Sequence, residues 1–158
     1  MSEARRSSFA TLGLAALGLA VLVSGARPAR ADITAECEVF EMSAKVGDKP
    51  SIDPELQRVE KKLKKPPFST WNQFTLLSHS QKALAKKKVE PINLKIGSAT
   101  ATLVEIVDKS KVRLTVTMED GKGKQMVSNT TTVEAGDHVI FVHSLANNEG
   151  HLLSLTCK

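Results

Sequence analysis

Aromatic residues are scarce in this sequence, which has five Phe, one Trp and no Tyr among 158 residues. Proteins that bind nucleic acid or carbohydrate by stacking need exposed aromatic side chains, and most of these few rings are needed for a core. The sequence also lacks a G-x-S-x-G nucleophile turn and a C-x-x-C metal-ligand pair. Its composition, 41% hydrophobic and 25% charged, excludes collagen-like, coiled-coil and wholly disordered chains and suits a single domain.

The first 31 residues have the pattern of a secretory signal peptide. A positive start at Arg5 and Arg6 precedes an uncharged, mostly apolar run over residues 9–23, and an Ala-Arg-Ala sequence ends at Ala31. Signal peptidase accepts only small side chains at the two alanine positions, so we expect cleavage after Ala31. Two alternatives stay open, an uncleaved membrane anchor over residues 9–26 and export by the twin-arginine route.

Cleavage after Ala31 would remove much of the positive charge of the chain. The whole chain has 22 basic and 17 acidic residues, of which the signal carries four and one, so residues 32–158 keep 18 and 16, a net charge of +2. A net charge of +2 is too small to favour nucleic-acid binding. We expect a secreted or periplasmic bacterial protein with no stable transmembrane span after cleavage.

The two cysteines, Cys37 and Cys157, lie near the two ends of the mature chain. Exported chains with two cysteines usually pair them, so we expect a disulfide that closes a loop of 120 residues. The chain-entropy model values such a bridge at roughly 4–5 kcal/mol. It also requires the first and last strands to be neighbours. The alternative is a reactive or metal-binding thiol.

Alternating apolar residues predict strands through most of the mature chain. Residues 34–44 form the first expected strand, and residues 46–51 an expected loop. Further strands are expected over residues 75–85, 89–96, 99–107, 112–118, 125–133, 139–145 and 152–156. Asp- and Gly-rich turns separate the later ones, so the sequence predicts a mainly β domain, a single antiparallel β-sandwich of about eight strands.

One amphipathic helix near the mature N-terminus is expected over residues 53–65. Asp53 suits the N-cap and Pro54 the first helical position, while Pro66 disfavours helix at the residue before it. Apolar residues recur at helical spacing on one face, which would pack on an edge or end of the sandwich: Ile52, Leu56, Val59 and Leu63.

Basic residues form two clusters, one on this helix and one in a turn. They are Arg58, Lys61, Lys62 and Lys65, and Lys86, Lys87 and Lys88. Together they predict a surface for an acidic protein or an anionic envelope polymer. The alternative is a solvated helix face, because Glu55 and Glu60 dilute its charge. The expectation is therefore an exported, non-enzymatic binding or structural module of the periplasm or cell envelope, with no cofactor.

Two rival functions have some support. A copper- or zinc-binding protein would use His79, His138 and His143, with Met42, Met118 and Met126 as soft ligands. A hydrolase would use Asp137, His143 and Ser144, although no nucleophile turn accompanies them. Scattered Met residues in strands usually fill a core, and His138 and His143 would face opposite sides of one regular strand.

Residues 65–77, KPPFSTWNQFTLL, follow the short basic helix and resemble a motif in uncharacterised small exported β-rich proteins of myxobacterial type. The order of parts is also similar: a signal, a helix, the KPPF segment, and a β-rich half with an MxDGK-like turn at residues 118–122. The resemblance covers most of the mature chain. It implies export and a β domain, and it implies no activity.

Overall fold

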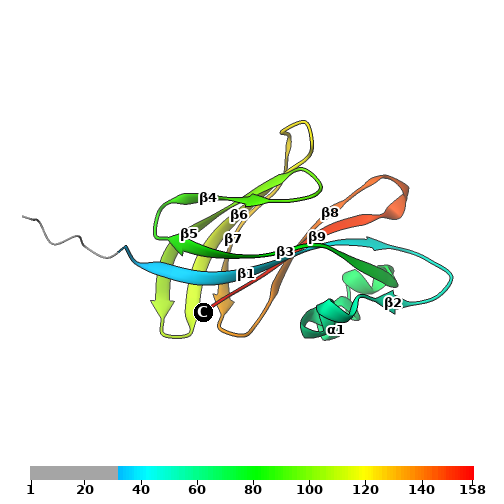
Figure 1. The fold of residues 1–158 in the computed structure, drawn as a ribbon, viewed down its shortest axis with the longest axis horizontal. Helices are drawn as coiled ribbons and strands as arrows, with labels where there is room; N and C mark the ends of the chain where they lie inside the picture. The colour runs from blue at the N-terminus through cyan, green and yellow to red at the C-terminus, as the bar shows by residue number, and fades with distance from the viewer. Residues whose placement is uncertain (1–31) are drawn as a thin grey trace, which may run out of the picture. The chain divides into compact units, whose positions relative to one another are not determined.

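The computed structural model describes residues 32–158, so the expected signal peptide lies outside the described residues. The described chain is mainly β, with strands in two sheets and little helix (Figure 1). The strands are β1 (Thr34–Lys45), β2 (Ser51–Ile52), β3 (Gln73–Ala85), β4 (Val89–Asn93), β5 (Ser98–Asp108), β6 (Lys111–Glu119), β7 (Gln125–Glu134), β8 (Val139–Ser144) and β9 (Gly150–Cys157). No helix within residues 32–158 is long and apolar enough to cross a membrane.

The first sheet has the strand order β2-β3-β1-β9-β8. Its central strand, β1, pairs antiparallel with both β3 and β9, which brings the two ends of the described chain together. Both faces of β1 are buried along part of its length, with Val39 on one side and Phe40 on the other. The short β2 pairs parallel with β3, a departure from the expected antiparallel pattern.

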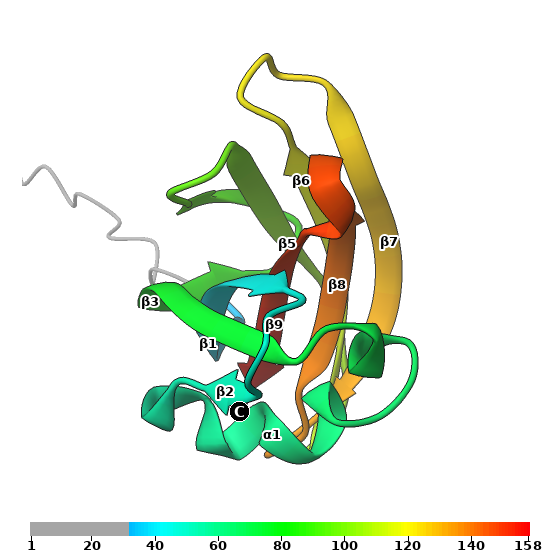
Figure 2. The ribbon, with the colours of Figure 1, turned by 90° about the vertical axis from the view of Figure 1, so that its right-hand side faces the viewer.

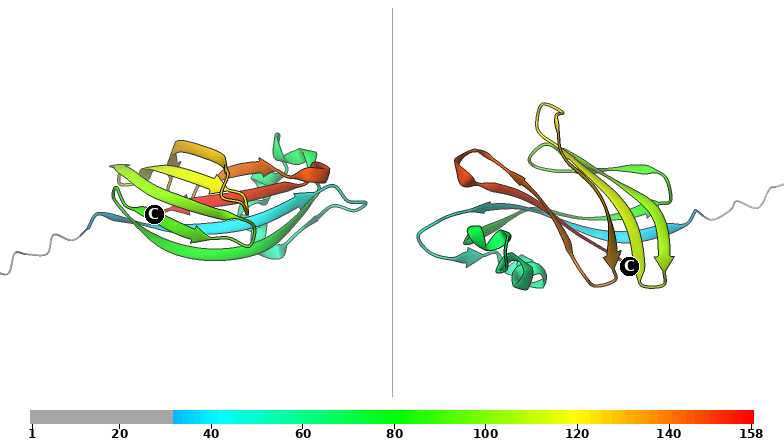
Figure 3. Two further views of the ribbon diagram at one scale, coloured as in Figure 1. Left: turned by 90° about the horizontal axis from the view of Figure 1, so that it is seen from above. Right: turned by 180° about the vertical axis from the view of Figure 1, so that it is seen from behind.

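The second sheet has the order β4-β5-β6-β7 and consists of consecutive antiparallel hairpins. Its curved strands are seen from two further directions in Figure 3. Gly97, directly before β5, has φ +66°, and a Cβ there would lie 2.0 Å from the Glu119 carbonyl oxygen. Only glycine combines that backbone conformation with so close an approach.

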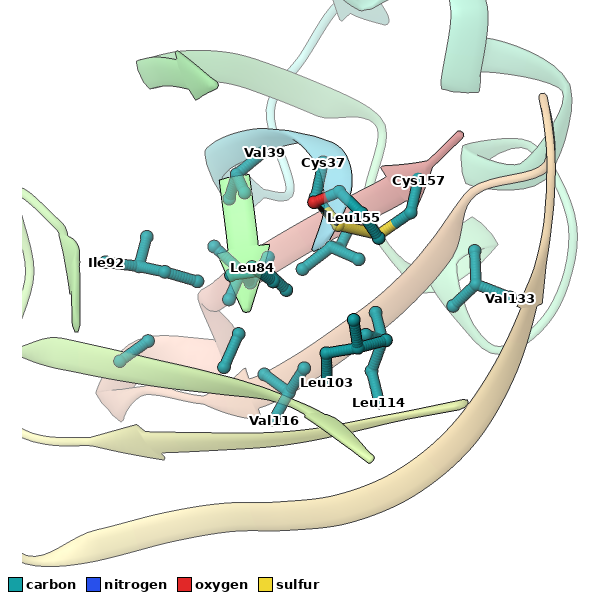
Figure 4. Close-up of a cluster of buried hydrophobic side chains, with 14 of the residues drawn as sticks. Cys37, Val39, Leu84, Ile92, Leu103, Leu114, Val116, Val133, Leu155 and Cys157 are labelled. Atoms are coloured by element: carbon teal, nitrogen blue, oxygen red, sulfur yellow. Dashed lines mark hydrogen bonds between the residues drawn. A yellow bond between two sulfur atoms is a disulfide. The ribbon is translucent and has the colours of Figure 1, made fainter. Parts of the chain in front are cut away.

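The main core lies between the two sheets and takes side chains from both (Figure 4). The alternating pattern of each strand sends every second residue into this layer. Fully buried examples are Leu153 and Leu155 from the first sheet, and Leu103, Leu114 and Val116 from the second. Cys37 and Cys157 belong to the same layer and form the predicted disulfide.

A second apolar cluster covers the opposite face of the first sheet, where the helix packs. Figure 1 shows α1 on the side of β1 and β3 that faces away from β4 and β5, and Figure 2 shows it from the end. The helical segment is a 3-10 turn, Pro54–Leu56, followed by α1, Gln57–Leu63. Three of the apolar residues expected on one face of the helix lie in this segment and are fully buried against Phe40 and Met42: Leu56, Val59 and Leu63.

Some element ends differ from the expected ones for identifiable reasons. The helix was expected to reach residue 65 but stops at Leu63, because Pro66 disfavours the helical conformation at Lys65. The strand expected over residues 89–96 stops at Asn93. The next amides, of Lys95 and Ile96, donate instead to the buried carboxylate of Glu41 in the other sheet.

Candidate binding cleft beside the helix

The structure gathers residues from three of the sequence-predicted groups around one cleft. The cleft has a volume of about 490 Å³, within the range of small-ligand sites. Glu38 of β1, Arg58 of α1 and His138 before β8 line it, and the disulfide closes its end near the C-terminus of β9. A basic residue, a candidate metal ligand and the cysteine pair thus meet at one place.

Glu38 is the centre of the charged groups in this cleft. Its carboxylate accepts a hydrogen bond from Nη1 of Arg58 at 2.8 Å, and its other oxygen lies 2.8 Å from Nε2 of His79. The His79 ring stacks on Phe40 with 4.6 Å between the ring centroids. Phe40 is anchored in the second apolar cluster, so the core beneath the cleft fixes the position of these polar groups.

His138 lies deeper, on the opposite side of Phe40, with 5.8 Å between the two ring centroids. Its Nδ1 is 3.1 Å from Oγ of Ser154, and both residues are buried. Burial lowers the pKa of His138 below its ordinary value, because charging the ring there loses its hydration; the nearby ammonium of Lys62 acts in the same direction and Glu38 opposes it.

Lys62 holds the loop that leads into β8. Its Nζ donates to the His138 carbonyl oxygen at 2.6 Å and lies 2.6 Å from Oδ1 of Asp137. The hydrogen bond from Lys62 lowers the pKa of Asp137. This helix-to-loop link makes Lys62 a structural residue, whereas Arg58 lies at the edge of the cleft with its side chain mostly exposed.

One polar atom in the wall of the cleft has no partner. Within residues 32–158, Oγ1 of Thr156 is buried and makes no hydrogen bond. Thr156 lies opposite Glu38 in the β1–β9 register, so the two side chains lie on the same face of the sheet. A buried hydroxyl without a hydrogen bond destabilises the fold unless a ligand or water bonds to it. The Thr156 hydroxyl is therefore a candidate contact for a ligand in this cleft.

The basic residues expected to form one surface lie in two places. Arg58, Lys61, Lys62 and Lys65 are on or directly after α1, while residues 86–88 follow the far end of β3. Arg58 contacts Glu38, and Gln81 of β3 lies opposite Glu38 in the β1–β3 register. Lys86 comes five residues after Gln81, so at about 3.3 Å per residue the two positions are roughly 17 Å apart. Lys88 is also paired with Asp32 at 2.7 Å.

The three candidate metal ligands do not meet. His79 and His138 lie on either side of Phe40, whereas His143 is paired in register with His151 on the face directed toward the other sheet. Across the described part of the chain, no three His, Cys, Asp or Glu side chains form a group that could hold a metal ion. Arg58 already supplies a cation to the carboxylate of Glu38.

Sequence reasoning missed the buried carboxylate of Glu41, which is 0% exposed. It accepts hydrogen bonds from the backbone amides of Lys95 and Ile96 and from Oγ of Ser78, and it lies 2.9 Å from Nε2 of His151. Burial raises its pKa, but the hydrogen bonds outweigh burial and lower the pKa to about 2. The sequence does place Glu41 on the same face of the expected first strand as Cys37 and Val39, and an acidic residue on that buried face indicates a buried carboxylate.

No family model, curated protein or solved structure matches this chain. The disulfide is compatible with an extracellular or periplasmic protein.

Proposed function

We propose that this chain is an exported, non-enzymatic binding module of the cell envelope, and that its basic helix and the adjoining cleft receive an anionic polymer. We take the two sheets around one core to be a β-sandwich that acts as a rigid support. The signal-like segment before residue 32 and the cysteine pair support export. The resemblance to small exported proteins of myxobacterial type points in the same direction.

The observation that carries the proposal is the position of Arg58. It lines the cleft and begins a stripe of exposed basic residues that continues at Lys61 and Lys65, at helical spacing. Among the described residues, no carboxylate lies within ion-pair distance of Lys61 or Lys65. Their charge is therefore available to a partner, in contrast to that of Lys62.

The cleft offers positioning groups rather than a catalytic set. Nucleophilic catalysis needs a hydroxyl or thiol beside a base, and here the cysteines are oxidised to a disulfide. The hydroxyl beside His138, Oγ of Ser154 at 3.1 Å from Nδ1, is fully buried and does not line the cleft. Glu38 is occupied by Arg58 and His79. Binding to the unpaired Thr156 hydroxyl and to the basic stripe is the function these groups support.

The test is retention of the purified mature protein on a heparin column, used as an anionic polymer, in a rising NaCl gradient. The stripe variant, Lys61→Glu with Lys65→Glu, is expected to elute at lower NaCl than the wild type, because it reverses the two unpaired charges. These positions are preferred to Lys62, whose loss would also release the loop before β8.

The matched control is Lys109→Glu with Lys122→Glu, at exposed turns of the second sheet. It changes the net charge by the same amount and is expected to elute like the wild type. Equal loss of retention in both variants would mean that only net charge matters, and it would refute a defined surface. No retention of the wild type at low salt would also refute the proposal.

A further inference from the structure

A second cleft lies beside the helical segment, at residues other than those of the Arg58 cleft. It has a volume of about 520 Å³ and is bounded by the residues leading into α1, by the side of α1 that carries Gln57 and Glu60, and by the segment around Trp71. The two clefts have no lining residue in common. The second cleft is therefore a separate candidate site.

Trp71 is the only tryptophan in the sequence, and it is partly exposed rather than buried. Its Nε1 donates to the carbonyl oxygen of Asn148 at 2.6 Å. A Cβ on Gly150 would lie 2.8 Å from the indole ring, so the ring packs directly on the glycine backbone. The indole is thus fixed at the cleft, although composition suggests that most of the few aromatic rings are needed for the core.

The rest of the lining combines apolar surface with groups that can both donate and accept hydrogen bonds. The buried residues Leu63 and Phe74 line the cleft, as do the exposed residues Ser51 and Ser69. The Gln57 side chain is exposed and makes no hydrogen bond to another residue of the described chain. An amide that is free to donate and accept suits a ligand bearing many hydroxyl groups.

Several polar side chains of this cleft already have partners within the described chain. One oxygen of Asp53 accepts the Glu55 amide at the start of the helical segment. Glu60 forms an ion pair with Lys64, and the side chain of Asn72 bonds the backbone of Gly47 in both directions, at 2.8 and 2.7 Å. With two acidic residues and one basic, the cleft does not favour an anion.

We propose that this second cleft binds a neutral oligosaccharide, with Trp71 as the stacking platform and Gln57 as the principal free hydrogen-bonding group. A sugar ring has an apolar face of C–H groups and an edge of hydroxyls, which match a rigid indole beside an amide and serine hydroxyls. Cleavage of a glycosidic bond needs two carboxyl groups free to act as acid and as base or nucleophile. Glu60 is held in an ion pair with Lys64, which leaves Asp53 as the only acidic lining residue outside an ion pair, so we infer that the site binds glycan without hydrolysing it.

Trp71 provides a direct measurement, because all tryptophan fluorescence of the protein comes from this cleft. The mature protein is titrated with chitotetraose, cellotetraose and maltotetraose. We expect a saturable change in emission with at least one of the three. Gln57→Ala, an exposed helix position where alanine favours the helix, should weaken that binding about tenfold (about 1.4 kcal/mol).

The Lys61→Glu, Lys65→Glu variant is the control, and it should respond to the sugar like the wild type, which separates this site from the anion-binding surface. The proposal is overturned if none of the three sugars changes the emission saturably. It is also overturned if Gln57→Ala binds as tightly as the wild type, since the response would then arise away from the cleft. Heparin retention is unaffected by either result.

Discussion

Glu41 and His151 are 110 residues apart in the sequence, yet the Glu41 carboxylate lies 2.9 Å from Nε2 of His151, with both residues buried. The same carboxylate accepts the backbone amides of Lys95 and Ile96, between β4 and β5. This cluster therefore ties the second sheet to the centre of the first. It stabilises the scaffold that positions both clefts.

Stability should fall in acid because of this carboxylate. The pKa of Glu41 is lowered in the fold from 4.5 to about 2, so its ionised form stabilises the protein above about pH 4.5. That contribution, about 3 kcal/mol, is lost as the pH falls from 4.5 toward 2. Glu41→Gln should lower the free energy of unfolding by a similar amount at pH 7 and flatten its dependence on pH below 4.5.

Urea unfolding at pH 7 and at pH 3 measures this effect. Glu36→Gln is the control, since Glu36 is exposed on the same strand, and it should change the free energy of unfolding by less than about 0.5 kcal/mol. An unchanged pH dependence in Glu41→Gln would show that the carboxylate does not carry the acid sensitivity.

His138 should give a second pH dependence, near neutrality. Its pKa is lowered in the fold, so the unfolded chain takes up a proton at a higher pH than the folded protein does. Stability is therefore greatest above about pH 6.5 and declines as the pH falls below that value. His138→Gln should remove this decline while His143→Gln keeps it, as measured by thermal unfolding between pH 5 and pH 8. Equal profiles for the wild type and His138→Gln would contradict the assignment.

The disulfide should stabilise the terminal strands. Cys37 and Cys157 are paired in the β1–β9 register and close a loop of 120 residues. Replacing both by serine should lower the free energy of unfolding by roughly 4–5 kcal/mol on the chain-entropy model. Urea unfolding of this variant is compared with that of the wild type with and without reductant. If reductant lowers the stability of the double variant as well, the effect is not due to the bridge.

Export predicts a defined mass for the protein recovered from its own host. Under native, non-reducing conditions we expect the mass of residues 32–158 less two hydrogens, because we expect the signal to be removed and the cysteines are paired. A mass that retains residues 1–31 would instead indicate a membrane-anchored chain, and a mass higher by one metal ion would favour a metal-binding protein.

Local patterns in the sequence predicted the hairpins of the second sheet well. In β5 and β6, alternating side chains reach the core and solvent in turn, and turn residues mark the ends of the strands. The disulfide was also predictable, from two cysteines in a chain that begins with a signal-like segment. The hairpins follow from residues that are neighbours in the sequence, and the disulfide follows from the number of cysteines.

Other features depend on contacts between residues far apart in sequence and were not predictable. The end of β4 is set by Glu41, more than fifty residues earlier, and the exposure of Trp71 is set by Asn148 and Gly150. The candidate site also has parts that the sequence predicted and parts that it did not. Arg58 and His138 could each be identified as a candidate, but their meeting at Glu38 and Thr156 follows from the strand register.

The most direct test of envelope binding is salt extraction of the envelope fraction from host cells that express the wild type, the stripe variant at Lys61 and Lys65, or the control at Lys109 and Lys122. We predict that the stripe variant is released at lower NaCl than the other two. Release of all three at the same NaCl concentration would contradict a binding surface on the helix.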